Sequence, residues 1–273
     1  MNNTILIHHL GYADLFSCNG IVNYYAGLKE NLKILVDTPD KIEILDYMYS
    51  GLSNVTCELP VVTIEKNIDE TCLFCHTSNE MMNCPRKYGS GCCNYVDWSK
   101  YQHEEIIKIG AFNEYCSWEK FRHSEENISF SHSFYKYNNI NIDHRIDKFS
   151  INRNFAREEE MYKNYNSSIT SEYSVIHDDS KRNITINRSY IKTKNIYNLD
   201  GSSETILDQI GIIENAEEIH FIDSSYSVLI YFLSFHYSKI AAIPKYLHLY
   251  PRPGRDYKIY QNPVPENWYN IYD

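Results

Sequence analysis

Residues 4–49 read TILIHHLGYADLFSCNGIVNYYAGLKENLKILVDTPDKIEILDYMY. Two short apolar runs, residues 4–8 and 33–37, predict strands, because each is bounded by polar or turn-forming residues. Residues 17–31 and 39–49 have the apolar spacing of helices. In the second of these, the residues spaced for one face are Ile42, Ile44, Leu45 and Met48. A strand-helix-strand-helix start of this kind predicts a parallel sheet joined by crossover helices.

The same alternation continues along the chain and then restarts. Strands are expected at 54–62, 70–74 and 106–112, and helices at 129–137 and 154–165, before a polar segment at 166–171. The second half predicts strands at 173–177, 218–222 and 239–243, with helices at 205–215 and 226–236. We therefore expect an α/β protein of two Rossmann-like domains, residues 1–166 with a Cys-rich insertion at 71–98, and residues 167–273.

Length and charge limit the classes of function. The 273 residues suit two α/β domains, and the net charge of −10 disfavours nonspecific binding to nucleic acid or to anionic membranes. The N-terminus has no basic segment before an apolar run, and no 18 apolar residues follow one another. These features predict a soluble, cytoplasmic protein without a signal peptide or a transmembrane segment.

Three polar turns follow predicted strands, at residues 8–14, 178–182 and 223–225. Ligands of open α/β sheets bind outside the carboxyl ends of the strands, so these turns are the candidate site. If the two halves face one another, all three turns line one cleft.

The turns of the second half offer groups for a phosphorylated ligand. Ser224 or Ser225 can cap the following helix, whose free N–H groups bind anions, and Asp223 can accept hydrogen bonds from sugar hydroxyls. Lys181 and Arg182, next to Asp179, can neutralise phosphates. Simple N-capping and a solvated turn are the alternative interpretations.

The first turn combines flexibility with a carboxylate. Gly11 permits close approach of backbone to a ligand, and Asp14 can either cap a helix or act as a general base. One of the paired histidines, with His9 as the candidate, is expected to face the cleft. Tyr12 can stack on a base or a sugar.

Several of these segments resemble one enzyme family. Residues 5–14 with 18–22 resemble the opening of GT-B glycosyltransferases related to the bacterial heptosyltransferases, which carry a G-x-G-D loop before their first helix. Residues 218–233 resemble the strand-DSG-helix donor site of the same enzymes. A middle stretch is similar to glycosyltransferases of large DNA viruses and some bacteria, and comprises residues 133–135, Arg145, Phe149, Arg153, Glu158, Glu159, residues 173–179 and Arg182.

The resemblance implies a GT-B fold, in which the parallel sheets of two Rossmann-like domains face a central cleft and the C-terminal tail packs back on the first domain. It implies metal-independent, inverting transfer of a sugar from a nucleotide-sugar donor to a glycan or glycolipid acceptor. Asp14 would be the general base, Asp223 would hold the donor sugar, and Ser224, Ser225 and Arg182 would contact its phosphates. The chain departs from the family pattern at two positions, where Ala13 and Ser225 stand in place of glycines.

The insertion concentrates soft metal ligands. Cys72 and Cys75 form a C-x-x-C pair, and Cys84 and Cys92 follow, so a structural zinc site is one interpretation. Free, partly buried thiols are the other, because disulfides are rare in a reducing compartment.

Three further functions stay open at the level of sequence. The departures at Ala13 and Ser225 fit a non-catalytic protein that binds nucleotides or sugars and retains the fold. An epimerase of nucleotide sugars also works on two facing Rossmann domains, but it needs further acid and base groups. A zinc-organised interaction module would use residues 72–93 alone.

Overall fold

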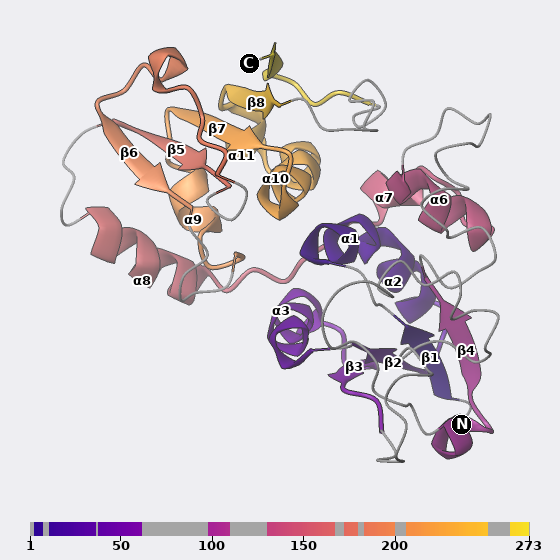
Figure 1. Ribbon diagram of the computed structural model, residues 1–273. Helices are drawn as coiled ribbons and strands as arrows, with labels where there is room; N and C mark the ends of the chain where they lie inside the picture. The colour runs from indigo at the N-terminus through magenta and orange to yellow at the C-terminus, as the bar shows by residue number, and fades with distance from the viewer. Residues whose placement is uncertain are drawn as a thin grey trace. The chain divides into compact units, whose positions relative to one another are not determined.

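The chain folds into two α/β units, each built on a parallel sheet. The computed structural model describes residues 3–7, 11–36, 38–61, 98–109, 130–166, 172–179, 183–199, 206–250 and 263–272. The units are Met1–Asn152 and Arg153–Asp273, and Figure 1 shows the strands of each as a separate set of aligned arrows.

The described strands of the first unit form a sheet of order β3-β2-β1-β4, in which every neighbouring pair is parallel. Ile5, Leu6 and Ile7 of the central strand are fully buried, as expected for a parallel sheet that is covered on both faces. The strands are β1 (Asn3–Ile7), β2 (Asn31–Leu35), β3 (Val55–Glu58) and β4 (Glu105–Lys108). They confirm the strands expected near 4–8, 33–37, 54–62 and 106–112. β1 and β2 begin one and two residues earlier than expected, β3 is shorter, and β4 begins one residue earlier and is shorter. The strand expected at 70–74 lies outside the described residues.

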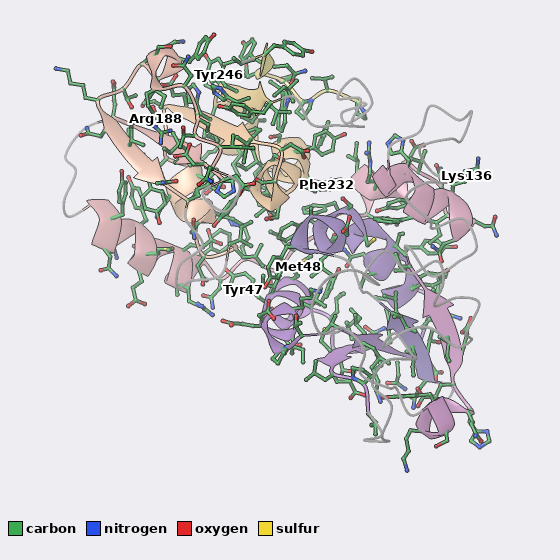
Figure 2. All side chains as sticks on the ribbon, viewed as in Figure 1. Tyr47, Met48, Lys136, Arg188, Phe232 and Tyr246 are labelled. Atoms are coloured by element: carbon green, nitrogen blue, oxygen red, sulfur yellow. The ribbon has the colours of Figure 1, made fainter. Side chains whose placement is uncertain are left out.

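The helices of the first unit differ from expectation at their start. The single helix expected at 17–31 is instead two helices, α1 (Tyr12–Ser17) and α2 (Asn19–Ala26), which meet at Cys18. Helix α3 (Pro39–Tyr49) has the expected bounds, because Thr38 is extended and Pro39 favours the first helical position. Its Tyr47 and Met48, which are labelled in Figure 2, are buried. The remaining described helices are η1 (Trp98–Tyr101), α6 (Phe130–Tyr137) and α7 (His144–Asp147).

A buried asparagine fastens the end of the first unit to α2. Asn19 donates from Nδ2 to the carbonyl of Ser150 at 2.9 Å, and its Oδ1 accepts from the Ser150 N–H at 2.8 Å. One residue later, Gly20 lies so close to α7 that a Cβ atom would stand 2.0 Å from the His144 carbonyl oxygen. The segment that leads out of this unit is therefore tightly packed against α2.

Within the described residues of the second unit, the strands form a parallel sheet of order β6-β5-β7-β8-β9. The strands expected at 173–177 and 218–222 are confirmed as β5 and β7 with the same bounds. The strands are β5 (Tyr173–His177), β6 (Asn195–Asn198), β7 (Glu218–Ile222), β8 (Lys245–Leu249) and β9 (Trp268–Tyr272).

The helices of the second unit cover one face of this sheet. The ring of Tyr173 on β5 packs against that of Tyr165 on α8, and its hydroxyl donates to the Ile212 carbonyl of α9. Phe221 of β7 packs on Trp268, whose ring also contacts Tyr231 of α10. These helices are α8 (Phe155–Asn166), α9 (Ile210–Ile213), α10 (Ser225–His236) and α11 (Ser238–Ala242).

The opposite face of this sheet is covered by the connection between β5 and β6. Ile176 and Ile222 pack with Ile186 of that connection, which also contains η3 (Arg188–Tyr190). Arg188 and Tyr246, labelled in Figure 2, lie in η3 and on β8, whereas Phe232 belongs to α10.

Three expectations about the second half are wrong. Residues 239–243 lie mainly in helix α11 instead of a strand, and the strand follows at β8, because the buried Lys245 amine bonds to carbonyls at the end of α11. The helix expected at 205–215 is the single turn of α9. Trp268 does not belong to a tail on the first unit, since β9 pairs with β8 and Trp268 packs on Phe221.

The boundary also lies earlier than the polar segment at 166–171. Helix α8 belongs to the second unit, because Arg157 pairs with Asp208 and Tyr165 packs on Tyr173 and Tyr197. Among the helices within the described residues, none is long and apolar enough to cross a membrane.

Candidate functional site

The first predicted turn leads directly into helix α1. Gly11 is the N-cap, and its N–H donates to Oδ2 of Asp14 at 3.1 Å. Asp14 therefore lies in the first turn of α1 and caps this helix, which is one of the two roles expected from the sequence. It does not precede a helix that starts at residue 17. Gly11 is exposed, and a Cβ atom there would meet nothing within 4 Å, so the backbone is open to an approaching group.

Two residues near Asp14, Tyr12 and Cys18, differ in their surroundings. The Tyr12 hydroxyl donates to Asp40 at the start of α3. Burial acts to raise the pKa of Asp40, but the hydrogen bonds from Tyr12 and Thr38 outweigh it, so this pKa lies below its ordinary value. Burial, followed by the charge of Asp14, raises the pKa of the Cys18 thiol, which makes Cys18 an inert core group.

The second predicted turn is the stem of a tight reversal after β5. Asp179 and Ile184 exchange backbone hydrogen bonds of 2.9 and 3.0 Å, and Asn183 has a φ of 54°. Asp178 accepts from the Ile186 N–H at 2.7 Å and pairs with Arg188. These bonds hold the stem in place at the carboxyl end of the sheet.

The third turn joins β7 to α10. Asp223 directly follows the strand, and Ser224 is the extended N-cap residue of the helix. The Ser227 hydroxyl accepts from the Ser224 N–H at 3.0 Å and donates to the Ser224 carbonyl at 2.7 Å. The hydroxyl of Ser224 is buried, and it has no hydrogen-bond partner within the part of the chain that the structure describes.

Parallel pairing brings the second and third turns together at the carboxyl end of the second sheet. β5 and β7 are neighbours, with His177 opposite Phe221, so Asp178 and Asp223 leave adjacent strands at the same end. A helix N-terminus at this end of the sheet presents unpaired N–H groups and the positive end of the helix dipole. The carboxyl end of the second sheet can therefore bind an anion, and carboxylates nearby can accept hydrogen bonds.

His177 and Tyr226 also lie at this end of the sheet, although the sequence analysis did not name them as site residues. Their rings pack with centroids 4.4 Å apart, and Nδ1 of His177 is 2.6 Å from the Leu199 carbonyl, to which it donates. The signal was present in the sequence, because His177 is the last residue of a predicted strand and Tyr226 lies one residue beyond Ser225.

Several predicted site residues lie in other parts of the chain. His9, Lys181 and Arg182 lie outside the described residues, as do all four candidate zinc ligands, Cys72, Cys75, Cys84 and Cys92. Their roles stay predictions, as does the facing of the two halves across a cleft.

Comparison with known proteins finds no matching protein-family model and no matching curated protein. A glycosyl transferase family 9 protein from Veillonella parvula is similar to the chain with a TM-score of 0.48 at 8% identity, over 100% of this chain and 86% of that one. The E. coli heptosyltransferase WaaC, solved with ADP, has a TM-score of 0.42 at 8% identity, over 99% and 90%. At such values the activity of this chain has to be argued from its own residues.

Proposed function

We propose that this protein is a glycosyltransferase that moves a sugar from a nucleotide-sugar donor to a glycan or glycolipid acceptor. The donor diphosphate binds at the N-terminus of α10, and Asp223 accepts hydrogen bonds from hydroxyls of the donor sugar. Asp14 of the first unit takes the proton of the acceptor hydroxyl as that oxygen attacks the anomeric carbon. The bond between this carbon and the diphosphate oxygen breaks, and the nucleoside diphosphate leaves with the bonding electron pair. The reaction inverts the anomeric configuration and needs no divalent metal.

The junction between β7 and α10 is the observation that carries this proposal. The N–H of Ser224 is already bound by Ser227, whereas the Ser224 hydroxyl is buried without a partner among the described residues. A buried hydroxyl that makes no hydrogen bond is unfavourable, and a phosphate oxygen can accept from it. The adjacent helix terminus adds a favourable field for the same negative charge.

Asp14 can be a base while it caps α1. A carboxylate oxygen that accepts a hydrogen bond is still basic, so the bond from Gly11 to Oδ2 is compatible with proton transfer to Asp14. That bond also orients the carboxylate. A positioned general base contributes about 10² to 10⁴ in rate.

Donor binding is tested first by thermal shift and calorimetry of the full chain with a panel of nucleoside diphosphates and nucleotide sugars. A donor present at about 100 times its Kd stabilises by about 2.7 kcal/mol. We expect Ser224→Ala to weaken that donor about three- to tenfold, the worth of one hydrogen bond. If no nucleotide on the panel binds, the transferase proposal fails.

Transfer is then measured with Asp14→Asn, whose amide oxygen can still accept from Gly11. We expect the rate to fall by about 100-fold or more while donor affinity is unchanged, and EDTA to have no effect on the wild type. Glu43→Gln, on the exposed surface of α3, is the matched control for removing a carboxylate. Full activity in Asp14→Asn would exclude Asp14 as the base, and lost donor affinity would place it in the donor site.

A non-catalytic nucleotide-binding protein is the second candidate function. The hydrogen bond from Gly11 gives Asp14 a capping role that needs no chemistry. Donor binding with no turnover across a broad acceptor panel would favour this function.

A further inference from the structure

Asn152, the last residue of the first unit, is held by that unit. Its N–H donates to the Met48 carbonyl at 3.0 Å, and its Nδ2 donates to the Ser50 hydroxyl at 2.7 Å. Its side chain also packs against Gly51, where an added Cβ would lie 3.6 Å from Cγ. Together with the bonds between Asn19 and Ser150, these contacts fix the chain up to residue 152.

Arg153, the next residue, is held by the second unit. Its guanidinium bonds to both carboxylates of an acidic pair, Glu158 on α8 and Glu214 at the end of α9. The same group lies 4.8 Å from the ring centre of Phe155 and 4.9 Å from that of Tyr237, after α10. Only 4% of its side chain is exposed. We call these five residues the Arg153 clamp.

Two consecutive residues are thus anchored to different units. The peptide bond between them is planar and rigid, so only the ψ bond of Asn152 and the φ bond of Arg153 can rotate without breaking an anchor. Hinges in proteins are a few residues at element ends that absorb large changes in these angles. We propose that the two units move relative to one another about the Asn152–Arg153 linkage, and that the Arg153 clamp makes α8 move with the second unit.

The alternative hinge is the polar segment at residues 166–171, where the composition suggests a linker. In that case α8 would move with the first unit. Its described contacts oppose this, since Arg157 pairs with Asp208 and the Tyr165 ring packs 4.5 Å from that of Tyr197 on β6. The two hinges therefore predict different partners for one helix, which can be measured.

The test uses spin labels on unnatural amino acids at exposed positions, so that the native cysteines stay in place. Glu43 reports α3 of the first unit, Glu160 reports α8, and Lys239 reports α11. We expect pulsed EPR of the full chain to give a narrow distance distribution for the 160–239 pair. The 43–160 and 43–239 distributions should be about twofold broader or more, because they span the hinge.

A broad 160–239 distribution with a narrow 43–160 distribution would place the hinge after α8 and overturn the proposal. Three narrow distributions would also overturn it, because no hinge would then move.

The role of the clamp is tested by Arg153→Met combined with Glu158→Gln and Glu214→Gln, which removes all three charges together and leaves none unpaired. The freed residues 153–154 should broaden the 43–160 distribution further, with circular dichroism unchanged. An unchanged distribution would show that the clamp does not set the hinge. Arg153→Lys should give an intermediate width, because one ammonium cannot bind both carboxylates in the same geometry.

Discussion

Replacing Arg153 by Met removes the positive charge of the clamp and keeps much of its volume. Glu158 is 2% exposed and Glu214 is 14% exposed, so the variant leaves two carboxylates largely buried without their cation. Removing one partner of a buried ion pair costs about 3–5 kcal/mol. We expect a loss of about 3 kcal/mol, at the lower end of that range, because Glu214 retains some contact with water.

The loss should depend on pH. Burial raises the pKa of Glu158 even beside Arg153, and without the guanidinium this pKa rises further. A carboxyl group whose folded pKa exceeds its unfolded value stabilises fully below the unfolded value, and this contribution is lost as pH rises through the folded value. The destabilisation by Arg153→Met should therefore be largest near pH 8 and smaller near pH 5.

Hydrogen exchange with mass spectrometry is the suitable assay, because it separates the units. Amides of β7 report opening of the second unit, and amides of β1 serve as an internal control that should not change. The neutral variant with Glu158→Gln and Glu214→Gln should recover most of the stability. The electrostatic reasoning is refuted if the single variant loses less than about 1 kcal/mol at pH 8, or if its loss does not vary with pH.

Three further predictions concern other contacts. Gly20→Ala should destabilise the first unit by about 1–3 kcal/mol in urea unfolding, because the new Cβ would stand 2.0 Å from a carbonyl oxygen of α7. Gly27→Ala is the matched control and should be neutral or stabilising, since its nearest neighbour is at 3.5 Å. Burial lowers the pKa of Lys245 to about 8, so the unfolded chain binds an extra proton between that value and about 10.4. Wild-type stability should rise with pH through this window relative to Lys245→Met, and parallel curves would contradict the assignment. Tyr12→Phe should raise the pKa of Asp40 in an NMR titration, and an unmoved pKa would show that the hydroxyl does not bind it.

The sequence predicted best those elements whose signals are local. Residues 218–222 form β7 with the expected bounds, since all five side chains are buried and a polar Asp-Ser turn follows at once. Helix α3 also has its expected bounds, because an extended Thr38 and Pro39 start it. The carboxyl-end turns of the second half were found for the same reason, as polar residues directly after apolar strands.

Strands with weak patterns were missed. The sequences of β6 and β9, NIYN and WYNIY, lie at the two edges of the described sheet of the second unit and are only partly buried. Burial on one face leaves little periodic signal in four or five residues. The run at 239–243 was misassigned because a short apolar stretch has no period that separates a helix from a strand.

By itself, the sequence determined the alternation of strand and helix, the parallel class of both sheets and the turns that carry the candidate site, because these depend on residues close together in the chain. Only the tertiary structure decided where the units divide and which distant group holds His177 at the carboxyl end of the second sheet. Those outcomes depend on long-range partners, such as Glu214 for Arg153 and Leu199 for His177, and no local pattern encodes which distant residue a side chain will meet.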